Sequence, residues 1–388
     1  MTEGIVVIGA GQAGAQISMS LRQGGFGGRI LMIGDEPYWP YQRPPLSKKF
    51  LSDRPAPDTL FLRPPAFWEA QRVERLLGVP VGAIDPRNRT VLFKDGREIG
   101  YRTLVLATGT RARALAAPGA GFAGVFSLRA IGDVERLRGA LDAAERVIVV
   151  GGGYIGLEVA AVMRAEGRAV TVLEAEDRVL KRVTAPAMSA FFDGVHRERG
   201  VDIRLGARLA AILGDGRVAG VRLADGSTLS ADLVLLATGA QANEELARDA
   251  GLACRDGILV DAFARTDVAD VYAAGDCTRF PSRRYGRLLR LESVQNAIDQ
   301  AKAAASAILG DPKPYDPVPW FWSDQYEIKL QIAGLQDGHD QSEMIGDPAA
   351  HRFAIEYRRE GRLIAVDAVN DGRAHMLARR RIAEETDS

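Results

Sequence analysis

The stretch VIVVGGGYIGLEVAAVMRAEG at residues 147–167, continued by RAVTVLE to residue 174, decides the fold. A solid apolar run, typical of a buried parallel strand, enters a turn of three glycines and then a helical pattern. A second apolar strand follows and ends on an acidic residue. This order of strand, glycine turn, helix, strand and acid is the pattern of a dinucleotide-binding unit.

The same pattern also occurs at the amino-terminal end of the chain. IVVIGAGQAG at 5–14 is followed by a second strand, RILMIGDE, at 29–36. A later strand recurs as well, as LVLATGT at 104–110 and as LVLLATGA at 233–240. The repeat therefore predicts one nucleotide-binding plan used twice, rather than a solenoid of short repeats.

Length and composition indicate a globular protein with several domains. A chain of 388 residues is too long for one ordinary core, so we expect two or three domains. Basic and acidic residues balance at 50 each, which argues against a polyanion-binding protein. The sequence has no apolar run long enough for a membrane-spanning helix, and the first strand begins too early to leave room for a secretion signal. We therefore expect a cytoplasmic protein.

Cysteine and histidine are scarce. Cys254 and Cys277 lie far apart and form no CxxC motif, which argues against a disulfide framework and against a cysteine-held metal cluster. We expect no metal site, and we expect Cys277 to be packed rather than nucleophilic. Four histidines are expected to be structural or solvated: His196, His339, His351 and His375.

The first glycine turn has the residue types that a pyrophosphate-binding loop requires. Its glycines allow a sharp turn, a close approach of the backbone to phosphate and tight packing of helix on strand: Gly9, Gly11 and Gly14. The helix amino terminus adds amide donors and partial positive charge. Asp35 ends the second strand, where its carboxylate can accept hydrogen bonds from ribose hydroxyls. We expect the helices after the two turns to end at Gly24 and Gly167 in left-handed caps.

The second turn repeats this arrangement, with Gly151, Gly153 and Gly156 as its glycines and Glu174 as its acid. A carboxylate there accepts a hydrogen bond from a free 2′-hydroxyl and repels a 2′-phosphate, so we expect a preference for NAD(H) over NADP(H). An alternative interpretation is that Glu174 is a solvated charge at a strand end. Three basic residues near it also leave the preference open: Arg178, Lys181 and Arg182.

The carboxy-terminal part has a different pattern. Residues 311–319, DPKPYDPVP, form a proline-rich connector. Beyond it, YEIKLQIAG at 326–334 alternates apolar and polar residues, and RFAIEY and RLIAVDAV flank the turn RREG at 358–361. These patterns predict an antiparallel hairpin within a small sheet.

Two dinucleotide folds imply two dinucleotides, a resident flavin (FAD) and a diffusing nicotinamide (NADH). We expect an α/β fold with two Rossmann-like dinucleotide-binding domains, glutathione-reductase-like, plus a small C-terminal α+β domain. The predicted domains are 1–112 with 243–319 for FAD, 113–242 for NAD, and 320–388 for the C-terminal sheet.

Several motifs resemble one known family. The stretches are GQAGAQ (11–16), PYQRPPLSK (40–48), YRTLVLATGTRAR (101–113), VIVVGGGYIGLEVA (147–160), DVYAAGDC (270–277) and RLESVQNAIDQAK (290–302). Together they are similar to the FAD-dependent ferredoxin reductases of bacterial oxygenase systems, whose members include putidaredoxin reductase and the reductases of Rieske-type dioxygenases. The resemblance covers essentially the whole chain, with a tail that is short for the family.

The resemblance implies a set of FAD-binding residues. They are Gly9, Gly11, Ala13, Gly14, Asp35, Arg43, Lys48, Val81, Thr108, Gly109, Arg129, Asp276, Glu292, Val294 and Trp322. Lys48 is implied to lie close to flavin N5, where its charge would favour the reduced, anionic flavin. The alternatives are a surface lysine like Lys49 and, for Trp322, an ordinary core residue.

The resemblance also implies the NADH-binding residues, which are Gly151, Gly153, Ile155, Gly156, Glu158, Glu174 and Gly239. Glu158 is implied to approach the nicotinamide, so Lys48 and Glu158 are the candidate catalytic residues. The expected reaction passes hydride from NADH to FAD and then single electrons to a 2Fe–2S ferredoxin, which serves a haem-thiolate monooxygenase or a Rieske dioxygenase.

Three other functions compete with this interpretation. A disulfide or peroxide reductase needs a reactive cysteine near the flavin, and YQRPPLSKKF at 41–50 contains none. A signalling flavoprotein similar to apoptosis-inducing factor would bind both cofactors but turn over poorly. An electron-entry subunit of the nitrite reductase type is the weakest alternative, because such chains usually carry additional cluster modules.

Two groups of basic residues are candidates for docking a ferredoxin that we expect to be acidic. They are Arg283, Arg284, Arg287 and Arg290, and the run Arg379–Arg381. Complementary charge would speed encounter and make turnover sensitive to salt. The alternative is a solvated basic face. The sequence is compatible with a monomer or a homodimer and predicts no nucleic-acid or membrane partner.

Overall fold

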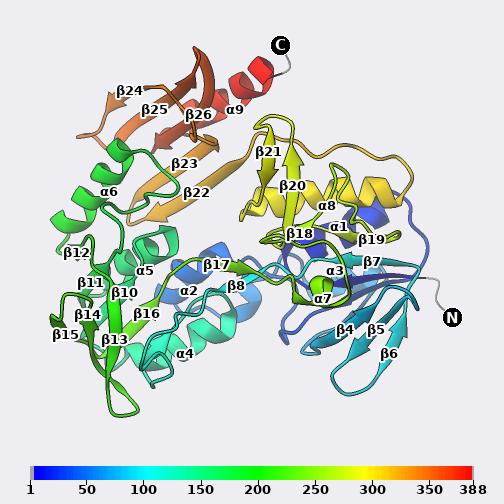
Figure 1. Ribbon diagram of the computed structural model, residues 1–388, viewed down its shortest axis with the longest axis horizontal. Coiled ribbons are helices and arrows are strands. Elements are labelled where there is room, and N and C mark those ends of the chain that lie inside the picture. Colours follow the sequence, from blue (N-terminus) through cyan, green and yellow to red (C-terminus); the bar gives the residue numbers. More distant parts are fainter. Residues whose placement is uncertain (1–3, 387–388) are drawn as a thin grey trace. The chain divides into compact units, whose positions relative to one another are not determined.

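The computed structural model describes residues 4–386 and divides the chain into two compact units (Figure 1). Unit 1 comprises the chain up to residue 42, residues 57–111 and residues 241–319. Unit 2 comprises residues 43–56, 112–240 and 320 onward. The segment 43–56, which we had placed in the first domain, thus belongs to unit 2, and so does the carboxy-terminal sheet.

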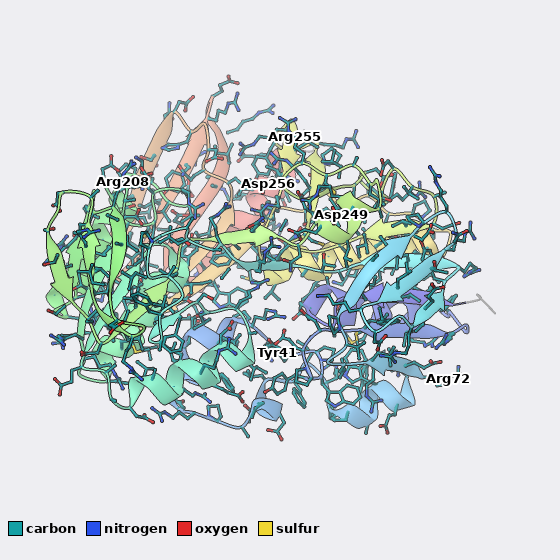
Figure 2. The ribbon with its side chains drawn as sticks, turned by 60° about the horizontal axis from the view of Figure 1, so that its bottom comes forward. Tyr41, Arg72, Arg208, Asp249, Arg255 and Asp256 are labelled. Carbon is teal, nitrogen blue, oxygen red and sulfur yellow. The ribbon has the colours of Figure 1, made fainter. Side chains whose placement is uncertain are left out.

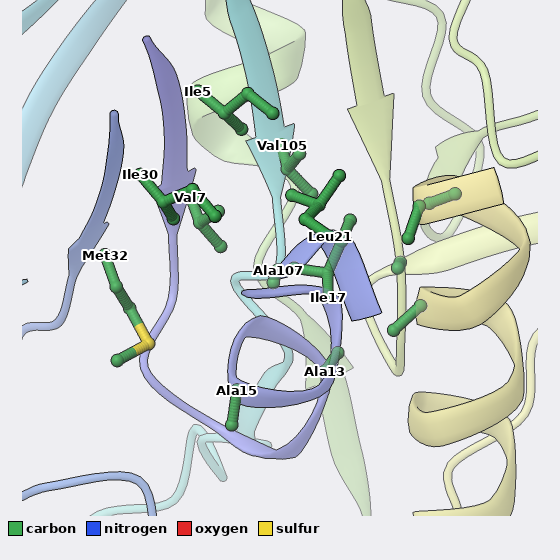
Figure 3. Close-up of a cluster of buried hydrophobic side chains, with 14 of the residues drawn as sticks. Ile5, Val7, Ala13, Ala15, Ile17, Leu21, Ile30, Met32, Val105 and Ala107 are labelled. Carbon is green, nitrogen blue, oxygen red and sulfur yellow. The ribbon is translucent and has the colours of Figure 1, made fainter. Parts of the chain in front are cut away.

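Unit 1 is built on a five-stranded parallel sheet in the order β19-β7-β1-β2-β3. The strands are β1 (Ile5–Ile8), β2 (Ile30–Ile33), β3 (Val73–Leu76), β7 (Thr103–Leu106) and β19 (Val271–Ala273). Strands β1 and β2 are buried along their whole length, which explains why their sequences are apolar at every position. Figure 3 shows part of the core that they form with α1 (Gln12–Gln23), with Val7, Ile17 and Met32 among its members.

Helix α8 (Val294–Ile308) packs against α1. Two small sheets complete unit 1. One contains β4 (Val81–Asp85), β5 (Thr90–Phe93) and β6 (Glu98–Gly100), and the other contains β18 (Ile258–Leu259), β20 (Thr278–Ser282) and β21 (Arg287–Leu289). The remaining short helices are η2 (Pro57–Leu60), α3 (Pro65–Ala70) and α7 (Glu245–Asp249).

Unit 2 contains a second five-stranded parallel sheet, in the order β12-β11-β10-β16-β9. Its strands are β9 (Val125–Phe126), β10 (Arg146–Val150), β11 (Ala169–Leu173), β12 (Asp202–Arg204) and β16 (Leu233–Leu236). The helices of this part are η1 (Pro44–Ser47), α2 (Lys49–Ser52), α4 (Ile131–Leu141), α5 (Tyr154–Ala165) and α6 (Pro186–Glu198). A three-stranded antiparallel sheet is formed by β13 (Leu209–Gly214), β14 (Val218–Leu223) and β15 (Thr228–Ser230).

The carboxy-terminal part of unit 2 is an antiparallel sheet in the order β22-β23-β26-β25-β24. Its strands are β22 (Trp320–Gln325), β23 (Ile328–Gly334), β24 (Gln341–Asp347), β25 (Arg352–Arg359) and β26 (Arg362–Val369). Helix α9 (Gly372–Thr386) packs on β23 and β26. The pairing of β25 with β26 confirms the predicted hairpin, and the α/β fold class is confirmed.

Two short strands, β8 (Thr110–Ala112) and β17 (Ala240–Ala242), each contain a point at which the chain passes from one unit to the other. No helix within residues 4–386 combines the length and the apolar character that crossing a bilayer requires.

One helix end differs from the prediction. Gly24 has φ −80°, and the left-handed residue is its neighbour Gly25, with φ +86°. In both helices the left-handed residue is the one that follows the C-cap, and in α1 that residue is Gly25, so the prediction for α1 was wrong by one residue. The prediction for α5 is confirmed, since Gly167 has φ +87°.

Candidate functional site

The first glycine turn is closed by packing at two positions and open at the third. Gly9 has φ +118°, and a Cβ there would lie 2.0 Å from the carbonyl oxygen of Ala107. A Cβ at Gly14 would lie 1.8 Å from the carbonyl oxygen of Gly9. A Cβ at Gly11 would meet nothing within 4 Å. The backbone at Gly11 therefore borders open space, as a phosphate-binding loop requires.

The start of α1 is suited to an anion. Gly11 is its N-cap, and no side chain caps the helix there. The first amides, including that of Ala13, thus keep their donor capacity and the positive end of the helix dipole. Asp35 follows β2 and is exposed, at the same end of the sheet as the turn. These residues fit the pyrophosphate and ribose of a dinucleotide.

The turn that carries Asp276 approaches the first glycine turn. A Cβ at Gly275, which has φ +90°, would lie 3.0 Å from the Cβ of Ala13. The Thr108 hydroxyl donates to the carbonyl oxygen of Asn243 (2.6 Å), and the Asn243 amide donates to the carbonyl oxygen of Thr108 (2.8 Å). The residue after this threonine, Gly109, has φ +62°. The sequence-predicted residues of this sheet end are thus brought together.

Gln300 is a residue of this site that the sequence did not single out. Its Oε1 accepts from the backbone N–H of Gly275 and from the Thr278 hydroxyl, both at 2.8 Å, and its side chain is fully buried. It therefore fixes the turn that contains Asp276. It lies within RLESVQNAIDQAK, but nothing in the local pattern distinguishes it from other polar helix residues.

The remaining predicted residues of unit 1 lie apart from the glycine turn in sequence. Val81 is the first residue of β4, and Val294 is the first residue of α8, whose N-cap Ser293 accepts from the N–H of Asn296 (3.0 Å). The Glu292 carboxylate accepts from Arg290 at 2.5 Å. Glu292 is thus engaged by an arginine that we had proposed for docking.

The second glycine turn repeats the geometry of the first. A Cβ at Gly151 would lie 2.4 Å from the carbonyl oxygen of Ala237, and one at Gly156 would lie 2.0 Å from that of Gly151. A Cβ at Gly153 would meet nothing within 4 Å. Gly153 is also the N-cap of α5, without a capping side chain. Ile155 in the first turn of this helix is 41 % exposed, which leaves apolar surface for a ligand.

The acid of the second turn is held by backbone amides. Glu174 Oε2 accepts from Gly152 N (2.7 Å), and its Oε1 accepts from Glu176 N (2.9 Å). The carboxylate is thus fixed against the glycine turn. The alternative of a freely solvated charge at the strand end is wrong for Glu174.

Two of the three nearby cations are engaged elsewhere. Arg178 donates to the carbonyl oxygen of Thr184 (2.8 Å), and Lys181 forms an ion pair with Glu176 (2.8 Å). The hydrogen bond from Lys181 holds the pKa of the Glu176 carboxyl below its ordinary value. Arg208, which is labelled in Figure 2, adds to this effect.

The third cation lies beside the loop after β16. The guanidinium of Arg182 would be 3.3 Å from a Cβ at Gly239, which has φ +96°. Arg182 thus lies beside a predicted NADH-binding residue.

Lys48 and Glu158 form a buried ion pair. Lys48 Nζ lies 2.7 Å from Glu158 Oε2, and their side chains are 17 % and 4 % exposed. Lys48 Nζ also donates to the carbonyl oxygen of Pro44 (3.1 Å). The neighbouring Lys49 is exposed, so the alternative that Lys48 is a surface lysine of the same kind is wrong. Both predicted catalytic side chains therefore lie together.

Two serines that sequence reasoning missed complete this cluster. The Ser47 hydroxyl donates to Glu158 Oε2 at 2.5 Å, and the Ser323 hydroxyl donates to Glu158 Oε1 at 2.6 Å. Ser47 ends η1 and Ser323 lies in β22, and both elements pack against α5. Each carboxylate oxygen thus has a hydroxyl donor.

The other predicted residues of unit 2 lie on neighbouring elements. Arg43 donates to the carbonyl oxygen of Arg129 (2.7 Å), which joins these two residues. Trp322 is half-buried and stacks on Trp320, with ring centroids 5.7 Å apart. Trp322 is therefore not a fully buried core residue.

The two cysteines have the properties of packed thiols. Cys277 is fully buried and Cys254 is partly buried. Burial raises the pKa of the Cys277 thiol, and burial raises the pKa of Cys254 to about 11. The packed state predicted for Cys277 is confirmed. Within residues 4–386, no three histidine, cysteine or acidic side chains are grouped as a metal site would need.

Comparisons with known proteins agree with this geometry. The chain matches the family model of pyridine nucleotide-disulphide oxidoreductases over residues 3–301 and the reductase C-terminal model over residues 320–388. It is 43 % identical, over 98 % of its length and 93 % of the relative, to the ferredoxin reductase subunit of 5,5′-dehydrodivanillate O-demethylase from a Sphingobium species.

Two solved structures are similar to this one. The ferredoxin reductase for the CYP199A2 system from Rhodopseudomonas palustris has a TM-score of 0.93 at 43 % identity, with 95 % of this chain and 91 % of that chain covered. The reductase of the covalent putidaredoxin reductase–putidaredoxin complex has a TM-score of 0.95 at 39 % identity, with 98 % and 93 % covered. The chain therefore belongs to the pyridine nucleotide-disulphide oxidoreductase family, in the group of ferredoxin reductases that serve oxygenase systems.

Proposed function

We propose that this chain is a flavoprotein reductase that passes electrons from NADH through FAD to a 2Fe–2S ferredoxin serving an oxygenase. The buried Lys48–Glu158 pair beside the second glycine turn is the observation that carries the proposal. The pair fixes the carboxylate of Glu158 on α5, the helix whose amino terminus would hold NADH. The similar proteins reported above are named ferredoxin reductases.

We propose that FAD is held by the predicted domain 1–112 with 243–319 and NADH by the predicted domain 113–242, with the sheet domain at 320–388. The segment 43–56 of the proposed FAD domain belongs to unit 2. When bound at these residues, FAD would supply the hydride acceptor for NADH and the one-electron donor for the ferredoxin. The amides at Gly11 and Ala13 would hold its pyrophosphate, and Asp35 would hold its ribose. The further FAD residues are Gly9, Gly14, Arg43, Lys48, Val81, Thr108, Gly109, Arg129, Asp276, Glu292, Val294 and Trp322.

On the nicotinamide side, the turn at Gly153 would hold the NADH pyrophosphate, while Ile155 and Gly239 would flank the cofactor. Glu158 would orient the nicotinamide, and Lys48 would keep positive charge near the flavin. We infer a preference for NADH over NADPH, because Glu174 is held in place and Arg178 and Lys181 are already paired. These interactions leave neither cation free to neutralise a 2′-phosphate.

The partner is a ferredoxin, and we propose that it is acidic. Arg283 and Arg287 are exposed, whereas Arg290 is largely buried and paired with Asp256 and Glu292. Within the group Arg283, Arg284, Arg287 and Arg290, the exposed pair is therefore the better candidate, and Arg379 and Arg380 of the second group are exposed as well. A cytoplasmic location and a monomer or homodimer fit this role.

Steady-state kinetics test the proposal. The purified protein should be yellow, retain FAD and reduce a 2Fe–2S ferredoxin with NADH. The rate of ferredoxin reduction should fall as the salt concentration rises. Replacing both Arg283 and Arg287 by alanine should weaken the salt dependence. A protein that binds FAD and NADH but reduces none of a panel of oxygenase ferredoxins would instead support the signalling flavoprotein similar to apoptosis-inducing factor.

A further inference from the structure

A chain of buried side-chain hydrogen bonds runs from Glu158 to the last turn of α6. The Ser323 hydroxyl donates to Glu158 Oε1 (2.6 Å), and Gln325 Nε2 donates to Ser323 Oγ (3.3 Å). Gln325 Oε1 lies 2.9 Å from His196 Nε2, and His196 Nδ1 lies 3.4 Å from the Tyr326 hydroxyl. Helix α5, strand β22 and helix α6 are thus joined by one polar path.

The path is dry. Ser323, Gln325 and His196 are fully buried, and Glu158 is 4 % exposed. Three buried polar side chains cost free energy unless each finds a partner, and here each one does. Ser323 and Gln325 are two apart on β22, so both project from the strand face that packs on α5.

The hydrogen bonds have one consistent direction. Because Ser323 already donates to Glu158, it must accept from the Gln325 amide, which leaves Gln325 Oε1 as an acceptor. His196 must then carry its proton on Nε2, and its Nδ1 can accept from Tyr326. Burial lowers the pKa of His196, which favours this neutral, singly protonated ring. Every donor in the path therefore points toward Glu158.

Ser323 restricts the rotation of the Glu158 carboxylate about its last side-chain bond. Lys48 and Ser47 both bind Glu158 Oε2. Ser323 binds the other oxygen, Oε1. Without that contact, the carboxylate would be held at one oxygen and could rotate about its last bond. The residues behind Ser323 in turn fix the direction of its hydroxyl.

We propose that Ser323, Gln325 and His196 are positioning residues, which hold the Glu158 carboxylate in the orientation that aligns the nicotinamide of NADH. The inference rests on the proposed function, because Glu158 must act on NADH for its orientation to matter. Misplacement of an aligning group by about 1 Å can cost on the order of a hundredfold in rate.

Rapid-mixing reduction of the FAD-loaded protein by NADH tests the proposal. Ser323→Ala and His196→Leu should each slow flavin reduction by about tenfold, with an apparent Kd for NADH that changes by less than about threefold. Ser323→Thr and His196→Gln retain the donor atoms and should restore most of the rate. His339→Leu removes a hydrogen-bonded histidine outside the path and should have no effect. Normal rates for both disrupting variants would overturn the proposal.

A thermal double-mutant cycle gives a readout that does not depend on NADH. His196 and Glu158 have no direct contact in the path, so their effects on Tm should add unless Ser323 and Gln325 couple them. The Tm loss of the Glu158→Gln, His196→Leu double variant should fall short of the sum of the single losses by about 2 °C or more. Additive losses would overturn the path. If NADH failed to reduce the flavin of the wild-type protein, the proposed function would be wrong. The thermal cycle would still show whether His196 and Glu158 are coupled, because it does not depend on NADH.

Discussion

Replacement of Lys48 by methionine should destabilise the protein by leaving a buried charge without its partner. The Glu158 side chain is 4 % exposed and loses its only cationic contact recorded in residues 4–386. Breaking a buried ion pair from one side typically costs about 3–5 kcal/mol. Because the hydroxyls of Ser47 and Ser323 still bind the carboxylate, we expect about 3 kcal/mol. This corresponds to a fall in Tm of about 6–12 °C for a unit of this size.

The assay is thermal unfolding of the FAD-loaded protein, with Lys49→Met as the matched control, because Lys49 is exposed and adjacent. The control should change Tm by less than about 2 °C. The double variant Lys48→Met, Glu158→Gln should regain most of the loss, since it removes the unpaired charge. Flavin reduction by NADH should remain slow in the double variant.

Two results would refute this reasoning. One is a Lys48→Met protein as stable as the Lys49→Met control. The other is a double variant that is no more stable than Lys48→Met alone, because the cost would then come from lost packing of the lysine stem rather than from an unpaired carboxylate. Both comparisons use the same chain, buffer and cofactor load.

Four further substitutions have expected outcomes. Gly11→Ala should fold normally but bind FAD at least tenfold more weakly in a fluorescence titration. Gly9→Ala should yield little folded protein, because the new Cβ would lie 2.0 Å from a backbone oxygen. Glu174→Ala should shift the ratio of kcat/KM for NADPH to that for NADH upward by tenfold or more, and an unchanged ratio would contradict the assigned role of the carboxylate. Burial raises the pKa of Asp367 from 3.8 to about 7, so the folded protein holds a proton that the unfolded chain releases between these values. The contribution of Asp367 to the free energy of unfolding is therefore present in full below pH 3.8 and is lost as the pH rises to about 7. The total loss is up to about 4 kcal/mol. Asp367→Asn should consequently raise Tm at pH 8 more than at pH 5, and an equal change at both values would argue against a buried, protonated carboxyl.

Local patterns in the sequence were sufficient for the two parallel sheets and the two turns. A glycine with positive φ, an apolar run that is buried on both faces and an acid at a strand end are each specified within a few residues. The boundary of α1 shows the limit of such reasoning, since Gly24 and Gly25 are the same residue type and only the backbone distinguishes which one takes the left-handed conformation.

The sequence by itself determined the repeated dinucleotide fold, and its resemblance to the ferredoxin reductases implied the roles of Lys48 and Glu158. The tertiary structure alone decided that these two side chains form a pair, and that Ser47 and Ser323 bind the same carboxylate. The partners are separated by 110, 111 and 165 residues in the chain. Contacts of that kind arise when η1 and β22 pack against α5, and no local preference of a serine indicates which distant carboxylate it will meet.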